Sequence, residues 1–168
     1  MLTTDVTLDG FVGQGGADPH WADRYYDDEL IRYHLRVLTK AGLHALEPDW
    51  EIDTLVELKT EGGREELAPI VAQGGPLFCQ ELTGRGLVDE YRITVHPVVF
   101  GEGDRLFAAA ERLYLISTRF FRMGSLAHTY VPERAYRDHP PPLPWAQGPG
   151  EHHDDPQSED PAQGPAPG

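Results

Sequence analysis

The chain has 168 residues, with 14 Lys and Arg against 28 Asp and Glu, and a formal net charge of −14. This length suits one domain, and the acidic charge makes nucleic acid and anionic membranes poor partners. No apolar run is long enough to cross a bilayer, no signal peptide is visible, and the single cysteine cannot form an internal disulfide, so we expect a cytoplasmic protein.

The first predicted elements are a strand and a helix, separated by a glycine-rich loop. Residues Thr3–Leu8 favour β structure and end at Asp9-Gly10, a pair typical of turns. After the loop at 13–20 comes a helix, in which Asp27 and Asp28 stand where an N-cap or first-turn acid is expected. Apolar spacing predicts the buried face of this helix at Leu30, Tyr33, His34, Val37, Leu38 and Ala41.

The middle of the chain predicts helix, strand, Gly-Gly turn and helix in succession. A helical pattern covers Ile52–Thr60, and a strand-like run covers Leu67–Ala72. Gln73-Gly74-Gly75 breaks this strand, and Pro76 opens a helix at a favourable first-turn position. A glycine pair lets the backbone approach a ligand, and free amides at a helix N-terminus favour phosphate. On local grounds alone, however, most such turns only connect two elements.

The C-terminal part of the body is rich in strands. Alternation of apolar and polar residues predicts a strand over 91–99, with His96 facing outward. Two further strands are predicted over Arg112–Phe121 and Ser125–Val131. Together these elements predict a mixed α/β domain over residues 1–133.

The last segment, 134–168, has a different composition. It contains nine prolines and only two basic against six acidic residues. Such a segment buries too little apolar surface to offset its ordering entropy, so we predict a disordered tail. A weaker hypothesis is that this acidic, proline-rich tail recruits a protein partner.

Some side chains have both a chemical and a structural interpretation. Asp27 or Asp28 could be a buried proton donor, although helix capping explains both more simply. Trp21 could line a pocket or simply pack. Cys79, one turn into an apolar helix, is predicted to be buried rather than nucleophilic.

Several familiar site patterns are missing from the sequence. No His, Cys, Asp or Glu spacing matches a metal site, and the run His152-His153-Asp154-Asp155 falls in the predicted tail. There is no Walker-type loop and no dinucleotide GxGxxG motif. No Ser–His–Asp arrangement can be argued from spacing.

Three blocks, in order along the chain, resemble one family. Thr3–Gly10 (TTDVTLDG), with the glycine-rich loop and Trp21 after it, resembles the N-terminal signature of dihydrofolate-reductase-like proteins. Gln73–Glu90 resembles the Gly-Gly turn, helix and LVDE segment of the reductase domain of the bifunctional riboflavin-biosynthesis deaminase–reductase. Val95–Gly103 (VHPVVFGEG), followed by Arg105-Leu106-Phe107, is similar to that domain's HPVVLG-G-RLF segment.

The resemblance covers most of residues 2–133, and Tyr130–Pro132 is similar to the family's terminal strand. It implies a dihydrofolate-reductase-like, three-layer α/β fold, with a mixed β-sheet flanked by helices. It also implies NADPH as the hydride donor and a small heterocyclic substrate, pyrimidine-like or pterin-like. The partners expected are this small molecule and a second copy of the chain.

The resemblance further implies two sets of site residues. The pyrophosphate of the cofactor would lie at the turn 74–77, and its nicotinamide near residues 7–10. The cofactor-binding residues would then be Gly74, Gly75, Pro76, Leu77, Thr7, Asp9 and Gly10. The substrate-binding residues would be Gln73, Trp21, and Asp27 or Asp28.

The sequence departs from the family after its first helix. There the family has a strand ending in a Gly-Arg-x-Thr-Tyr-Glu motif, which holds the ribose and 2′-phosphate side of the cofactor. Here Leu43–Leu46 runs directly into Glu47–Trp50 without that motif, so a piece of about 30 residues or more is missing. Either a clean internal deletion or a damaged or misassembled reading frame explains the gap. Two hypotheses follow: an NADPH-dependent reductase similar to 5-amino-6-(5-phosphoribosylamino)uracil reductase, or a non-catalytic remnant that acts as a dimeric binding or scaffold module.

Overall fold

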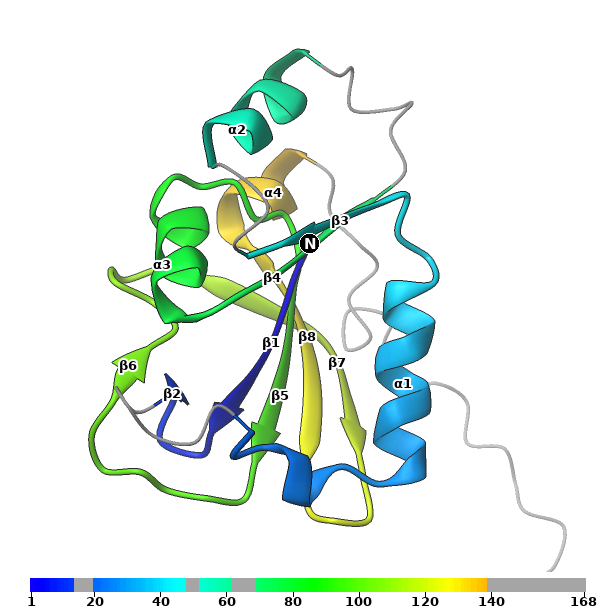
Figure 1. Cartoon of the computed structure of the whole chain (residues 1–168). Helices are drawn as coiled ribbons and strands as arrows, with labels where there is room; N and C mark the ends of the chain where they lie inside the picture. The colour runs from blue at the N-terminus through cyan, green and yellow to red at the C-terminus, as the bar shows by residue number, and fades with distance from the viewer. Residues whose placement is uncertain (14–19, 48–51, 62–68, 139–168) are drawn as a thin grey trace, which may run out of the picture.

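The structure, a computed structural model, describes residues 1–13, 20–47, 52–61 and 69–138, and its main element is a six-stranded sheet (Figure 1). The strand order is β3-β4-β1-β5-β8-β7. Neighbours from β3 to β5 are parallel, whereas β8 and β7 are antiparallel to their neighbours. The strands are Leu43–Leu46 (β3), Ile70–Gln73 (β4), Leu2–Thr7 (β1), Tyr91–His96 (β5), Leu126–Pro132 (β8) and Leu113–Phe120 (β7).

Helices and a small second sheet complete the described part of the chain. Strands β2 (Phe11–Gly13) and β6 (Asp104–Arg105) pair with each other. None of the described helices combines the length and the apolar character needed to span a bilayer. The helices are the 3-10 turn η1 (Asp23–Tyr25), α1 (Asp28–Leu38), α2 (Ile52–Glu61), α3 (Pro76–Gly84) and α4 (Glu133–Asp138).

The two faces of the sheet carry different layers. Strand register aligns Leu2 with Tyr91, and both belong to a large hydrophobic cluster that includes Phe78 and Leu82 of α3. The opposite face aligns Asp5 with Thr94 and packs against α1. Because α1 and α3 thus lie on opposite faces, the predicted three-layer architecture is confirmed (Figure 1).

Most predicted elements are confirmed, with shifted ends. Helices form over α1, α2 and α3, and Pro76 occupies the first turn of α3 as expected. Five short elements had not been assigned from the sequence, namely β2, η1, β3, β6 and α4. Helix α4 extends past the predicted domain boundary after residue 133, and Tyr136 packs on Tyr114 with ring centroids 4.2 Å apart. The rest of the predicted tail, including the run 152–155, lies outside the described residues.

The prediction that His96 faces outward is wrong. Its side chain is completely buried, with 0% exposure. Alternation of polar and apolar residues indicates which side chains are exposed only where one face of the strand contacts solvent. Strand β5 is an interior strand, and both of its faces are covered. On the α1 face, the rings of Trp21, Tyr25 and Tyr26 surround the imidazole at centroid distances of 5.4, 5.3 and 5.9 Å.

A glycine contact fixes the small sheet beside the N-terminal loop. Gly103 has a φ of +149°, and a Cβ atom there would lie 2.3 Å from the carbonyl oxygen of Gly13. We expect Gly103→Ala to lower the free energy of unfolding by about 2 kcal/mol or more in urea titrations. The control is Gly84→Ala, since a Cβ atom at Gly84 meets nothing within 4 Å. Equal effects of the two substitutions would contradict this interpretation.

Candidate active site

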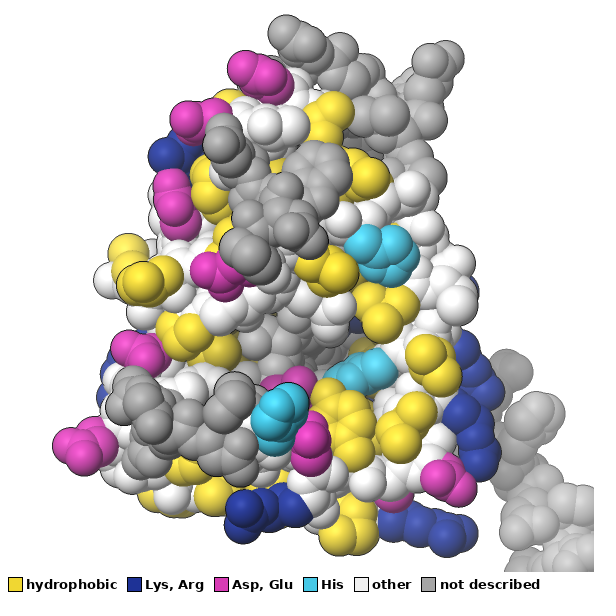
Figure 2. Space-filling view, viewed as in Figure 1, with side chains coloured by type: hydrophobic (Ala, Val, Ile, Leu, Met, Phe, Trp, Pro, Cys, Tyr) yellow, Lys and Arg dark blue, Asp and Glu magenta, His cyan; other side chains and the backbone are white. Residues whose placement is uncertain are grey.

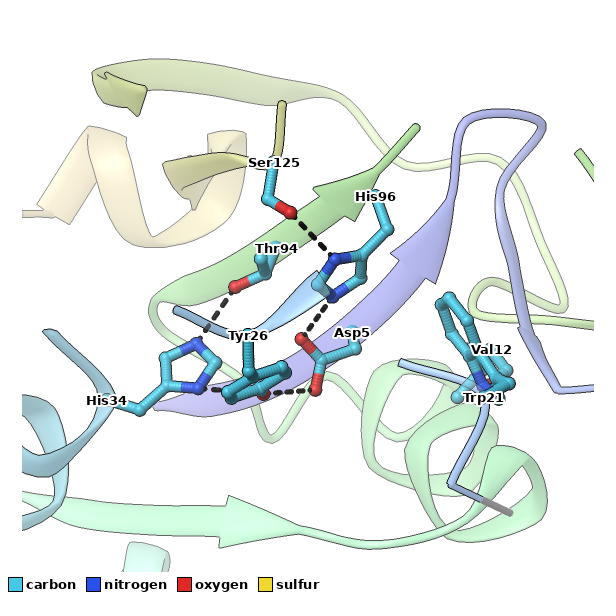
Figure 3. A network of polar contacts seen from close by, with 8 residues as sticks. All are labelled: Asp5, Val12, Trp21, Tyr26, His34, Thr94, His96 and Ser125. Atoms are coloured by element: carbon cyan, nitrogen blue, oxygen red, sulfur yellow. Dashed lines mark hydrogen bonds and ion pairs between the residues drawn. The ribbon is translucent and has the colours of Figure 1, made fainter. Parts of the chain in front are cut away.

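A network of polar side chains lies on the α1 face of the sheet, and its centre is Asp5 of β1 (Figure 3). One carboxylate oxygen of Asp5 lies 2.9 Å from Nε2 of His96. The other lies 2.9 Å from the hydroxyl of Tyr26. Because both oxygens are engaged, the orientation of the carboxylate is fixed.

Two outer branches extend the network. Nδ1 of His96 lies 2.9 Å from Oγ of Ser125, just before β8. On the other side, the Tyr26 hydroxyl lies 2.9 Å from Nδ1 of His34, whose Nε2 lies 3.0 Å from Oγ1 of Thr94. The fold therefore brings together side chains from β1, the segment before α1, α1 itself, β5 and the start of β8.

The directions of these hydrogen bonds follow from the donors available. A carboxylate only accepts, so His96 donates from Nε2 and Tyr26 donates its one hydroxyl proton to Asp5. The hydroxyl of Ser125 then donates to Nδ1 of His96, and His34 donates from Nδ1 to the Tyr26 oxygen. Burial, reinforced by the charge of Asp5, raises the pKa of Tyr26, which keeps its proton. The donors of His96 and Tyr26 thus converge on the carboxylate of Asp5.

The residue types of Ser125, His96 and Asp5 are those of a hydrolase triad, but their arrangement is different. Ser125 is 0% exposed, so no substrate carbonyl can reach its hydroxyl. The imidazole also presents Nδ1 to the serine and Nε2 to the aspartate, the reverse of a Ser–His–Asp triad. We therefore interpret Ser125 and His96 as residues that position Asp5.

Asp5 is the member of this group that a ligand can approach. Its side chain is 28% exposed, whereas that of His96 is 0% exposed. The space-filling view shows this face recessed beside α1, with hydrophobic and histidine side chains around the recess (Figure 2). Trp21, predicted to lie near the substrate, packs edge-on against His96 and Phe100, and its indole donates to the Val12 carbonyl at 3.1 Å.

The predicted phosphate-binding turn joins β4 to α3, and an acidic side chain already contacts it. The amide of Gly75, the N-cap of α3, donates to Oε2 of Glu47 at 2.6 Å. A Cβ atom at Gly74 would lie 2.5 Å from Phe78 and 2.9 Å from Glu47, so only glycine fits there. Glu47 follows β3, the place where the family's arginine motif is missing. The turn therefore presents an amide to an anion, and in this structure the anion is a side chain of the same protein.

The other predicted residues around this turn differ in accessibility. Gln73 ends β4 and its carbonyl accepts from the amide of Glu47 at 3.2 Å. Leu77 is 77% exposed. Cys79 is buried, as predicted, and burial raises the pKa of its thiol to about 11, which disfavours the reactive thiolate.

Thr7, Asp9 and Gly10 form a turn at the end of β1. The Thr7 hydroxyl donates to Asp9 at 2.6 Å and accepts from the amide of Phe11 at 2.9 Å. Asp9 also accepts from the amide of Gly101 at 2.8 Å. These bonds, chiefly the one from Thr7, lower the pKa of Asp9. The three predicted residues thus shape the loop after β1, and their role toward a cofactor stays a prediction.

Asp27 and Asp28 lie apart from the network around Asp5. Asp27 accepts from the amides of Glu29 and Leu30 at 3.0 and 2.8 Å, which confirms that it caps α1. Asp28 lies 3.7 Å from Arg32. The accessible acid on this face of the sheet is therefore Asp5, a residue that the sequence analysis did not select.

His34 gives the network a measurable pH dependence. Burial lowers its pKa from the ordinary value of 6.5, although the charge of Asp5 opposes the shift. At a pH between the unfolded pKa of 6.5 and the lower folded pKa, the unfolded chain binds more protons at His34 than the folded chain does. His34 therefore contributes stability above pH 6.5, and this contribution is lost as the pH falls through the folded pKa. We expect unfolding titrations to show a smaller loss of stability below about pH 6.5 for His34→Gln than for the wild type. The same loss in both would contradict a neutral, partly buried His34.

More than half of the chain matches a known protein family. Residues 26–126 match the family model described as the RibD C-terminal domain. YyaP of Bacillus subtilis (strain 168) is 33% identical over 82 residues, which is 47% of this chain and 42% of that protein. The chain therefore spans less than half the length of this relative.

Solved structures share the fold at low sequence identity. RibD of Acinetobacter baumannii superposes with a TM-score of 0.61 at 11% identity, over 78% of this chain and 57% of that chain. Dihydrofolate reductase from Enterococcus faecalis, complexed with NADP(H), superposes with a TM-score of 0.51 at 13% identity, over 79% and 95% of the two chains. The fold is therefore dihydrofolate-reductase-like.

Proposed function

Because the chain belongs to the RibD C-terminal domain family, we propose that it is an NADPH-dependent reductase of a small heterocyclic substrate, pyrimidine-like or pterin-like. The substrate would resemble that of 5-amino-6-(5-phosphoribosylamino)uracil reductase.

One observation carries this proposal. The amide of Gly75 at the start of α3 holds a carboxylate oxygen of Glu47 at 2.6 Å. An amide that binds one anionic oxygen in this way offers the donor that a phosphate needs. Since both anions would use the same amide, Glu47 must move away when the cofactor binds.

The cofactor would lie across the ends of β1 and β4. Its pyrophosphate would contact Gly74, Gly75, Pro76 and Leu77, and its nicotinamide would lie near the turn Thr7–Gly10. When bound, NADPH supplies a hydride to the substrate. The protein positions the two reactants. Glycine at position 74 lets the turn pack closely against Phe78, because a Cβ atom there would lie 2.5 Å from that ring.

The substrate would bind in the recess beside α1. There the carboxylate of Asp5, held by His96 and Tyr26, can accept a hydrogen bond from a ring N–H. Gln73 and Trp21 would lie beside the ring. Reduction of a C=N bond needs a proton as well as the hydride, and the hydrogen-bonded chain from His34 through Tyr26 offers a route for that proton to the Asp5 carboxylate in the recess.

A nucleotide titration tests the proposal. Quenching of tryptophan fluorescence should give a saturable curve with NADPH, and absorbance at the nicotinamide band should fall when a pyrimidine or pterin substrate is added. Absence of NADPH binding at millimolar concentration, in the wild type and after removal of the Glu47 carboxylate, would refute the reductase proposal.

The contact between Glu47 and Gly75 also favours the second candidate function. If Glu47 never leaves the turn, the protein is a non-catalytic module that keeps the reductase fold and acts through binding, as a homodimer. Such a protein would elute as a dimer in size-exclusion chromatography with light scattering and would show no affinity for NADPH. Substrate-dependent NADPH oxidation would exclude this alternative.

A further inference from the structure

A second cleft, separate from the recess over Asp5, lies between α1 and the β7–β8 hairpin. This open cleft has a volume of about 610 Å³, which is in the range of small-molecule sites. Seven charged side chains line it, four of them arginines: Asp27, Asp28, Glu29, Arg32, Arg36, Arg119 and Arg122. The chain as a whole has only 14 Lys and Arg and a net charge of −14, so this concentration of arginine is unusual for the molecule.

The carboxylates in the cleft do not neutralise all four arginines. Arg119 lies 2.7 Å from Glu29, and Arg32 lies 3.7 Å from Asp28. Within the described part of the chain, the guanidinium groups of Arg36 and Arg122 have no hydrogen-bond or ion-pair partner. Since arginine stays charged at any physiological pH, the cleft keeps two positive groups that an anion can bind.

Three of the four arginines lie on a helix or a strand, and Arg122 lies in the turn between β7 and β8. Arg32 and Arg36 are four residues apart on α1 and therefore lie on the same side of the helix. Arg119, near the end of β7, lies over the rings of Tyr33 and Phe121 at 5.9 and 5.5 Å, which restricts its guanidinium. The cleft thus presents donors from two sides, a geometry that suits the several oxygens of a phosphate group.

We propose that this cleft binds a phosphate-bearing small molecule of nucleotide size, in a site distinct from the turn at Gly75. The arginines belong to α1 and the β7–β8 hairpin, whereas Gly75 caps α3 on the opposite face of the sheet. Arg36 and Arg122 bind the phosphate oxygens directly. Arg119, oriented by Glu29, closes the inner side of the cleft.

Calorimetry with inorganic tripolyphosphate tests this site on the full chain at low salt. The double variant Arg36→Gln/Arg122→Gln removes the two unpartnered charges. The control Arg24→Gln/Arg137→Gln removes two exposed charges elsewhere. The site predicts at least a tenfold rise in the dissociation constant for the first variant and less than a twofold change for the control.

The same titration is repeated in the presence of saturating NADPH. Unchanged tripolyphosphate affinity supports a separate site. Loss of binding in the presence of NADPH would overturn the proposal, because the anion would then occupy the nucleotide site. Equal weakening in both double variants, or no heat of binding to the wild type, would also overturn it.

Discussion

Replacement of Glu47 by alanine is expected to increase the affinity for NADPH by about tenfold. The Glu47 carboxylate accepts a 2.6 Å hydrogen bond from Gly75, the amide that we assign to a phosphate oxygen. Binding of the nucleotide must break this bond and also bring phosphate close to a negative side chain. Removal of the carboxylate eliminates both costs, and solvent screening at this exposed position limits the gain.

The measurement is a fluorescence titration of NADPH against wild type, Glu47→Ala and Glu81→Gln. Glu81 lies on α3, the helix that Gly75 caps, and pairs with Arg85. Its substitution therefore removes a nearby negative charge without removing a contact of the turn. We expect Glu81→Gln to stay within about twofold of the wild type. Equal affinity of Glu47→Ala and wild type would show that Glu47 does not compete with the nucleotide.

Replacement of Asp5 by asparagine should reduce substrate turnover by about a hundredfold or more, the usual scale for loss of a positioned acid–base group. The carboxamide would turn one NH₂ group toward donors, since Tyr26 and His96 both donate to Asp5. The network would therefore lose the carboxylate at its centre, and one of the hydrogen bonds from Tyr26 and His96 would have no acceptor. We also expect a lower free energy of unfolding, by about 1–3 kcal/mol.

Initial rates of NADPH oxidation check this prediction, and Thr94→Val provides a matched control. Thr94 is three hydrogen bonds from Asp5 along the network, at the end of the branch through Tyr26 and His34. Its isosteric substitution should keep turnover within about tenfold of the wild type, because Asp5 retains both direct donors. Wild-type turnover in Asp5→Asn would exclude Asp5 from the reaction.

The parts of the fold that depend on local sequence could be predicted. The Asp27 cap and the apolar spacing identify α1, and Pro76 after a glycine pair identifies the start of α3. By contrast, β3 has four residues, too few to show a periodic pattern, and it forms through parallel pairing with β4.

The candidate site could be predicted only in part, because its key contacts join distant residues. Asp5 and His96 are 91 positions apart in the chain and meet because β1 and β5 pair in parallel. A buried histidine on an interior strand cannot be told from an exposed one by alternation alone. Glu47 and Gly75 likewise meet only because β3 and β4 end at the same edge of the sheet.

The claim on which the functional proposal depends is that the amide of Gly75 binds a phosphate oxygen of the nucleotide. Its ¹H–¹⁵N NMR resonance reports this contact directly. The proposal predicts a saturable shift of the Gly75 resonance on addition of NADPH, with the same dissociation constant as the fluorescence titration and a lower one in Glu47→Ala. A Gly75 resonance that stays in place while NADPH binds elsewhere would contradict the proposal.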